Sequence, residues 1–286
     1  MAISEFTSVQ AADTFRAGYE RSFSRLWPVP YSAVDVPTAY GPTRAYRCGP
    51  STGVPFVLLP GAGGNSLMWH RHVAALAADR PVIAIDPVGE PGGSAQQRPI
   101  TGGADLGAWL RAVLSTLEVP HAHLVGCSPG GWIALQATDR AASISLLDPA
   151  GLGRVTPAFL AWVVAGGLAA LTPRGVRHRL AGPLRNATLR DDKLMPLLRA
   201  SMRFRRRLPV PPPLTDEMVR ALHGVPLLVL LGARSQLYAA EAVATRLRSL
   251  VPTARVEVVA GAGHDLPVHS PGVVVDRIRT FTAGVS

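Results

Sequence analysis

Short apolar runs alternate with stretches of helical periodicity along most of the chain. Six runs of about five residues have the length and the aliphatic composition of buried strands. Helical stretches lie between several of them, and this alternation predicts a mostly parallel sheet with helices on both faces. The predicted strands are 55–59, 81–85, 122–126, 143–147, 227–231 and 255–259, and the predicted helices are 8–26, 68–78, 105–117, 132–138 and 241–250.

One long interval breaks this alternation. Between residues 150 and 224 we find helical patterns and a proline run at 209–213, but no convincing strand. The expected division is therefore a core of residues 1–149 and 225–286, with residues 150–224 inserted as a helical cap. Such a cap would cover the carboxyl ends of the strands, where open α/β sheets bind ligands.

The net charge of +10 is concentrated in the predicted cap. Residues 174–207 hold ten Arg and one Lys against two Asp, so the rest of the chain is nearly neutral. This pattern is typical of a solvated helical surface; alternatively, Arg199, Arg203, Arg206 and Arg207 attract an anionic substrate or an acidic carrier protein. No zinc-finger spacing or interleaving of aromatic and basic residues indicates nucleic acid.

Cysteine content and hydropathy indicate the compartment. The only two cysteines, Cys48 and Cys127, do not form a disulfide framework in a chain this long, and no signal-peptide run is present at the start. The longest uncharged apolar stretch, 158–171, is shorter than the roughly 20 residues that span a bilayer. We expect a cytoplasmic protein without a transmembrane helix. Residues 158–171 are expected in a core or along a pocket, with interfacial membrane contact as the alternative.

A serine motif lies between the third predicted strand and the helix that follows. Residues 126–130 read Gly-Cys-Ser-Pro-Gly, which matches G-x-S-x-G in a strand–turn–helix context. Gly126 and Gly130 allow the close backbone approach that exposes Ser128 as a nucleophile; the alternative is a tight turn with an idle serine. A serine needs a base, and His264, in the loop after the last predicted strand, is the candidate.

The other histidines do not indicate a metal. His70 and His72, and likewise His121 and His123, form His-x-His pairs without a third ligand at metal-site spacing. We expect these histidines on surface helices or loops, and we predict no metal and no cofactor. Cys127, beside the nucleophile, is expected to be a small buried residue.

Taken together, the motifs resemble the α/β-hydrolase superfamily, and most closely its small bacterial carboxylesterase-type members. The resemblance covers most of the chain, and it implies the α/β-hydrolase fold and cleavage of a carboxylic ester or thioester through an acyl-enzyme. The segments that carry it are 26–30 (LWPVP), 58–62 (LLPGA), 86–90 (DPVGE), 108–110 (AWL), 126–130 (GCSPG), 147–150 (LDPA) and 261–264 (GAGH).

The resemblance also implies a set of site residues. The usual His-Gly dipeptide is Pro60-Gly61 here, and the residue at Ala62 lends its backbone N–H to the oxyanion hole. Four further residues are expected to contact the substrate. For the two apolar ones among them, burial in the core is the alternative. The four are Gly61, Gly63, Met68 and Trp69 from the loop after the first predicted strand; Trp162 and Leu168 are the corresponding candidates from the cap.

Two positions depart from the family pattern. Pro129 follows the nucleophile, and proline has no N–H for the second oxyanion donor. A substrate hydroxyl, a water, or the N–H of Gly63 or Gly64 would have to replace it. The usual acid position after the strand 227–231 is Ser235, which leaves the histidine without its expected carboxylate.

Asp148, after the neighbouring strand, is the preferred substitute for this acid, as in the minority of the fold that places the acid there. Glu241, Asp265 or no acid at all remain as alternatives. The small-molecule substrate is expected to carry an acyl group. Two other functions stay open: a non-hydrolytic enzyme that uses His264 for elimination, cyclisation or proton transfer, and a binding protein that retains only the pocket.

Overall fold

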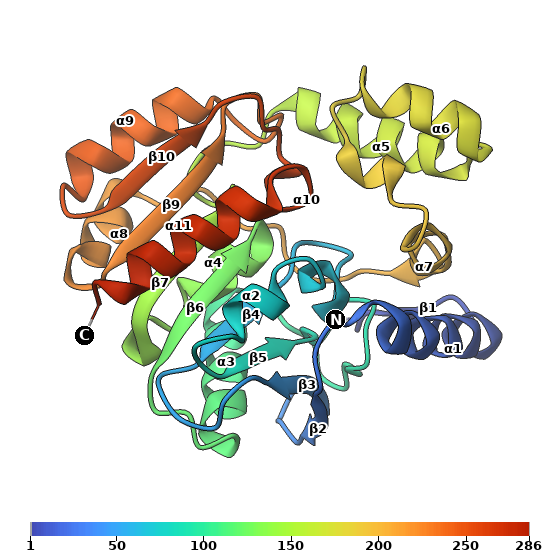
Figure 1. The fold of residues 1–286 in the computed structure, drawn as a ribbon, viewed down its shortest axis with the longest axis horizontal. Coiled ribbons are helices and arrows are strands. Elements are labelled where there is room, and N and C mark those ends of the chain that lie inside the picture. Colours follow the sequence, from blue (N-terminus) through green and yellow to red (C-terminus); the bar gives the residue numbers. More distant parts are fainter. Residues whose placement is uncertain (1, 286) are drawn as a thin grey trace.

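The computed structural model describes residues 2–285 and is built around an eight-stranded sheet (Figure 1). The strand order is β10-β9-β7-β6-β4-β5-β3-β2, and all neighbours are parallel except the pairs β3–β5 and β2–β3. The prediction of a mostly parallel α/β sheet is therefore confirmed. The strands are β2 (Ser32–Val36), β3 (Thr43–Cys48), β4 (Phe56–Leu59), β5 (Val82–Ile85), β6 (Ala122–Cys127), β7 (Ala141–Leu147), β9 (Leu227–Gly232) and β10 (Arg255–Val259).

The sequence analysis does not predict β2 and β3. β2 lies at the sheet edge with most of its residues exposed or half-buried, and β3 carries Arg44 and Arg47. Neither strand has a continuous apolar run, because such runs arise where both faces of a strand are covered. Their positions are set by antiparallel pairing, in which Ala45 of β3 lies opposite Ile85 of β5.

Helices cover both faces of the sheet (Figure 1). Successive residues of β4 alternate between two cores: Val57 and Leu59 pack with α3, α4, α8 and α9, whereas Phe56 and Leu58 pack with α1, α2 and α11. The helices are α1 (Val9–Leu26), α2 (Val73–Leu76), α3 (Gly103–Thr116), α4 (Pro129–Ala134), α5 (Pro157–Leu171), α6 (Arg174–Ala181), α7 (Met195–Ser201), α8 (Asp216–Arg220), α9 (Ala240–Leu250), α10 (Leu266–His269) and α11 (Pro271–Ala283). Short 3-10 turns are η1 (Ser66–Trp69), η2 (Thr138–Arg140), η3 (Ala187–Arg190) and η4 (Ala221–Gly224).

The interval between β7 and β9 adds no strand to the central sheet and holds α5 to α8. The expectation of no strand there is nevertheless wrong in one detail. Residues Phe204–Arg205 form β8, which pairs with the N-terminal β1 (Glu5–Phe6), and α1 packs against α7. The N-terminal segment thus contacts the predicted cap, through a pairing almost two hundred residues apart that no local pattern signals. The division into core and cap stays a prediction.

Two of the four paired histidines are buried, contrary to the expectation of surface positions. His72 is 1% exposed and His123 is 2% exposed, and burial lowers the pKa of each ring to about 4. Arg80 donates to His123 Nε2 at 2.5 Å, so the neutral ring carries its proton on Nδ1 and donates to Ser143 Oγ at 2.8 Å. His123 is buried because β6 runs through the centre of the sheet, and the His72 ring packs edge-on against the buried Trp69.

Both cysteines are buried and free, as the absence of a disulfide framework predicts. Within residues 2–285, no helix is at once long enough and apolar enough to cross a bilayer.

Candidate active site

Ser128 lies at the tight turn between β6 and α4. Its backbone has φ +51° and ψ −122°, a conformation that a residue with a side chain rarely adopts. A Cβ at Gly126 would lie 2.4 Å from Gly130 O, and one at Gly130 would lie 2.4 Å from Leu59 O. Only glycine fits these two positions, so both glycines are required for the turn that presents the serine.

The structure brings Ser128, His264 and Asp148 into one hydrogen-bonded row. Ser128 Oγ lies 3.0 Å from His264 Nε2, and His264 Nδ1 lies 2.6 Å from Asp148 Oδ2. The three residues follow β6, β10 and β7, and the carboxyl ends of these parallel strands meet at one edge of the sheet. Because a carboxylate only accepts, Nδ1 carries the proton and Nε2 is free to accept from the serine hydroxyl.

Asp148 has no exposed surface, and three donors hold its carboxylate. Besides His264, Gly232 N–H donates to Oδ1 at 3.1 Å and Ser235 Oγ donates to Oδ2 at 2.6 Å. Ser235, at the position where the family carries its acid, thus supports the carboxylate of the neighbouring strand. These bonds satisfy a buried anion that would otherwise be costly.

The two alternative acids do not reach the histidine ring. Asp265 Oδ2 accepts from the backbone N–H of Ala187, and Glu241 is exposed in the first turn of α9. Sequence reasoning missed Gln236, whose Oε1 accepts the backbone N–H of His264 at 3.3 Å. Asp265 and Gln236 therefore fix the loop that carries the histidine.

The loop after β4 lies against the nucleophile. A Cβ built at Gly61 would be 3.6 Å from Ser128 Cβ, and the backbone N–H of Ala62 has no partner within residues 2–285. The N–H groups of Gly63 and Gly64 are already used, because they donate to Glu90 Oε2 at 2.9 Å and to Gly61 O at 3.0 Å. Neither group replaces the donor that Pro129 lacks.

Glu90 connects this loop to the basic segment of the predicted cap. Its side chain is 4% exposed, and its second oxygen accepts from Arg206 Nε at 2.7 Å. Burial raises the pKa of the Glu90 carboxyl, while Arg206 opposes that rise. Arg206 is therefore held in an internal ion pair, which removes it from the group of arginines expected to attract an anion.

If the Ala62 N–H is the oxyanion donor that the family resemblance implies, a small displacement of the Gly63 loop moves it away from the reacting oxygen. We therefore expect Glu90→Gln to lower kcat about 10- to 100-fold with little change in KM. Because its pKa is raised, Glu90 is protonated at a higher pH than an ordinary glutamate. The activity of the wild type should therefore approach that of the variant as the pH falls. Steady-state kinetics on a p-nitrophenyl ester measure both effects. Glu241→Gln, at an exposed carboxylate, is the matched control; equal kinetics in the two variants would contradict the role of Glu90.

Two aromatic residues of α5 contact the histidine ring edge-on. The ring centroid of His264 lies 4.9 Å from that of Phe159 and 5.9 Å from that of Trp162, and the Trp162 indole donates to Leu184 O. Trp162 thus lies beside the His264 ring, and its contact with a substrate stays a prediction. Phe159 was not predicted, although its position one turn before Trp162 on the same helix is a usable signal.

The other apolar candidates do not all reach the site. Met68 is half-buried, but Trp69 has no exposed surface and packs in the core with Leu67 and Val73, so its assignment to the substrate is wrong. Leu168 is 65% exposed, so it is not a core residue. The burial of Trp69 and the exposure of Leu168 both depend on how their helical turns pack against the rest of the chain, which the sequence does not show.

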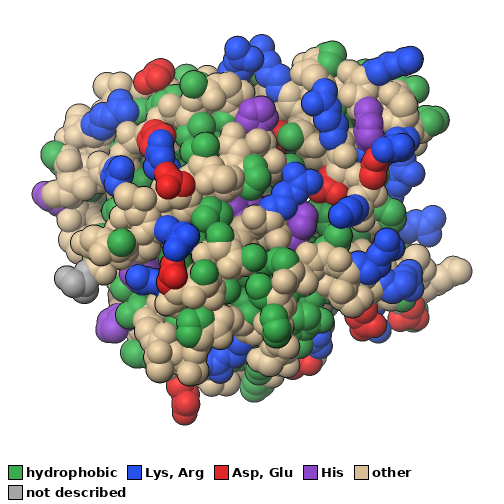
Figure 2. Space-filling view, in the orientation of Figure 1, with side chains coloured by type: hydrophobic (Ala, Val, Ile, Leu, Met, Phe, Trp, Pro, Cys, Tyr) green, Lys and Arg blue, Asp and Glu red, His purple; other side chains and the backbone are tan. Residues whose placement is uncertain are grey.

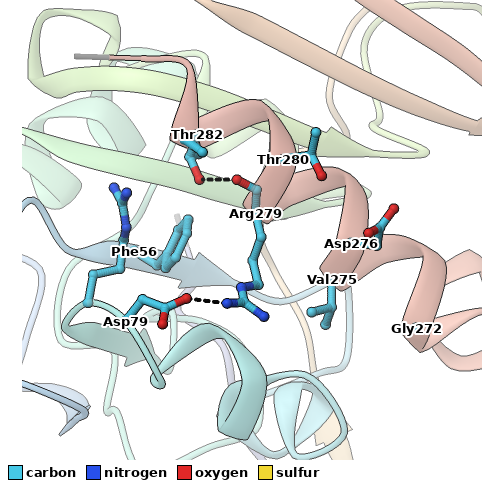
Figure 3. Close-up of a pocket in the computed structure, with 10 residues that line it drawn as sticks. Phe56, Asp79, Gly272, Val275, Asp276, Arg279, Thr280 and Thr282 are labelled. Carbon is cyan, nitrogen blue, oxygen red and sulfur yellow. Dashed lines mark hydrogen bonds and ion pairs between the residues drawn. The ribbon is translucent and has the colours of Figure 1, made fainter.

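Two surface clefts contain none of the three hydrogen-bonded residues. One, of about 430 Å³, lies beside α11, where Arg279 pairs with Asp79 near Phe56 (Figure 3). The other, of about 490 Å³, lies between the end of α1 and η3. Within the described residues 2–285, no three His, Cys, Asp or Glu side chains gather as metal ligands.

The chain is similar to two bacterial carboxylesterases over most of its length. Carboxylesterase YbfK of Bacillus subtilis is 26% identical over 98% of this chain and 97% of its own length, and the uncharacterized carboxylesterase nap of the same organism is 28% identical over 92% and 90%. The crystal structure of naproxen esterase from Bacillus subtilis superimposes with a TM-score of 0.84 at 25% identity, covering 96% of this chain and 99% of that one. The model of the alpha/beta hydrolase family matches residues 56–277, which include the serine turn, Asp148 and His264, and the chain therefore belongs to the alpha/beta hydrolase family.

Proposed function

We propose that the protein hydrolyses carboxylic esters or thioesters through an acyl-enzyme on Ser128. The observation that carries this proposal is the continuous row from Ser128 through His264 to the buried Asp148. Similarity to two carboxylesterases over more than nine-tenths of the chain supports the same reaction class.

In the proposed mechanism, Ser128 Oγ attacks the carbonyl carbon while His264 Nε2 takes the hydroxyl proton. The carboxylate of Asp148 keeps the other ring proton on Nδ1 and stabilises the imidazolium that forms. When the tetrahedral intermediate collapses, the C–O or C–S bond breaks and His264 returns the proton to the leaving alcohol or thiol. Water then attacks the acyl-enzyme by the same route, which releases the carboxylic acid and restores Ser128.

The oxyanion of the intermediate is proposed to accept from the Ala62 N–H. Because Pro129 offers no N–H and those of Gly63 and Gly64 are used elsewhere, the second donor is proposed to be a water or a hydroxyl of the substrate. Loss of one oxyanion donor costs acyl-transfer enzymes on the order of 10² to 10³ in kcat. We therefore expect slower turnover on simple esters than on esters with a hydroxyl beside the carbonyl.

Labelling with a fluorophosphonate tests the proposal, because the phosphorus is attacked only by an activated serine. We expect one label per chain, located on Ser128 by peptide mass spectrometry, and slower labelling in His264→Ala, where the base is missing. Ser24→Ala, at an exposed serine of α1, is the matched control and should label like the wild type. A folded wild type that stays unlabelled would instead favour the non-hydrolytic use of His264.

A further inference from the structure

The outer side of α5 is an exposed aliphatic surface. Five of the thirteen large hydrophobic side chains that the structure leaves exposed lie on this helix, between 49% and 65% exposed, at spacings that place them on one side. We call them the α5 face: Leu160, Val163, Val164, Leu168 and Leu171. Contiguous exposed apolar side chains on a folded protein mark interaction surfaces.

The inner side of the same helix covers the candidate active site. Phe159 and Trp162 contact the His264 ring, and Gly166 is buried one turn further along. The whole helix, Pro157–Leu171, carries no charged side chain. Packing on the protein explains the apolar character of the inner side, but it does not explain that of the outer side.

Exposed cations without carboxylate partners lie on the segments that follow α5 in the chain. α6 and α7 pack against α5, and Figure 2 shows Lys and Arg side chains gathered over this part of the molecule. The Arg199 guanidinium donates to Ala170 O and Thr172 O at the end of α5. Five further exposed cations of this region make no ion pair within residues 2–285: Arg179, Arg185, Arg190, Lys193 and Arg203.

We propose that the α5 face and these cations dock the protein on an anionic lipid surface. Aliphatic side chains enter the boundary between headgroups and acyl chains, while arginines bind the lipid phosphates. A second copy of the chain would bring two sets of unpaired cations together, and this repulsion opposes a dimer through the same face. A soluble acidic protein would match the charge but not five exposed aliphatic side chains.

Docking in this orientation would place the helix over His264 at the lipid boundary. The inference concerns binding alone and does not depend on hydrolysis. Ser128→Ala is therefore expected to bind lipid as the wild type does, and this keeps a failure of the proposed function distinct from a failure of the docking surface.

Flotation of the full chain with vesicles tests the proposal. We expect the protein to float with vesicles of phosphatidylcholine mixed with phosphatidylglycerol, and to remain unbound with phosphatidylcholine alone. Leu168→Glu should lower the bound fraction more than about tenfold, and Arg179→Glu about tenfold, since each removes an attraction and adds a repulsive charge. Val9→Glu on α1, at a valine that is 78% exposed, and Arg220→Glu on α8 are the matched controls and should float normally.

Circular dichroism and the melting temperature establish that each variant is folded. We expect all of them to fold, because substitutions at surface positions usually change stability little. Three results would overturn the proposal. The first is no flotation of folded wild type with the anionic vesicles, and the second is equal flotation of Leu168→Glu. The third is a dimer in sedimentation equilibrium that Leu168→Glu dissociates while lipid binding is absent, which would make a second copy the occupant.

Discussion

Replacing Ser128 with alanine is expected to reduce kcat on a short p-nitrophenyl ester by about 10⁶-fold, close to the rate without enzyme. The substitution removes one heavy atom, Ser128 Oγ. This oxygen lies 3.0 Å from His264 Nε2, which can take the proton of the hydroxyl. The backbone conformation is no more strained for alanine than for serine, so the fold should be retained. Initial rates at saturating substrate, with the melting temperature of the variant, measure the effect.

Ser24→Ala serves again as the control and should retain full activity, because this serine is exposed on α1 and contacts only Arg21 O. Cys127 does not offer a substitute nucleophile, since burial and the nearby Asp148 raise the pKa of its thiol. Turnover by Ser128→Ala within tenfold of the wild type would exclude the acyl-enzyme on this residue.

Asp148→Asn is expected to lower kcat by about 10⁴-fold, the effect of the same change in the enzyme where it was measured. An amide at position 148 no longer supplies the charge that stabilises the imidazolium, and its NH₂ group can favour the wrong tautomer of His264. Asparagine tolerates the positive φ of +43° found at this position, so loss of activity should not reflect loss of the turn. Kinetics of the purified variant measure the loss of catalysis, and thermal unfolding shows whether the fold is retained.

Ser235→Ala is the informative companion of this variant. It removes one hydrogen bond to the Asp148 carboxylate but leaves those from Gly232 and His264, so we expect a loss of at most about tenfold. Adding Ser235→Asp to Asp148→Asn should recover part of the activity, because it returns a carboxylate to the family's usual position. Unchanged kcat in Asp148→Asn alone would show that the histidine works without this acid.

Positions 148 and 235 lie side by side because of the sheet. β7 and β9 are parallel neighbours, with Leu147 opposite Leu230, and Asp148 N–H donates to Leu230 O at 2.8 Å. Adjacent strands lie about 4.8 Å apart. A carboxylate after either strand can therefore reach the same imidazole, and the Ser235 hydroxyl donates to the carboxylate of Asp148.

The number of cations in the basic segment does not show how many of them are free at the surface. Arg177 is buried and bonded to Asp192, and Arg206 is paired with Glu90, so two of the cations predicted as free surface charge are internal. Conversely, Arg179 and Arg203 are exposed without an acidic partner in the described chain. The sequence places all of these residues in one helical segment, but only the packed structure distinguishes a solvated cation from an internal one.

The sequence alone determined the features that depend on local chemistry. Apolar runs predict six strands, and five of them, β4, β5, β6, β7 and β9, are central strands with both faces covered. Glycine at positions 126 and 130 is a local signature of the turn at Ser128, although the contact that excludes a side chain at Gly130 is with Leu59. The order of the serine and the late histidine also follows from the sequence. These features can be recognised in the sequence without knowing which residues are in contact in the folded chain.

Only the tertiary structure decided the rest. It placed Asp148, rather than Glu241 or Asp265, beside the His264 ring, and it placed Trp69 and His72 in the interior. It also added β2 and β3 at one side of the sheet, where polar residues interrupt the apolar pattern. Each of these outcomes rests on contacts between residues far apart in the chain, such as the 116 residues between His264 and Asp148. Such contacts form because strands and helices pack to cover a shared core, and the direction in which each side chain then points is a property of that packing.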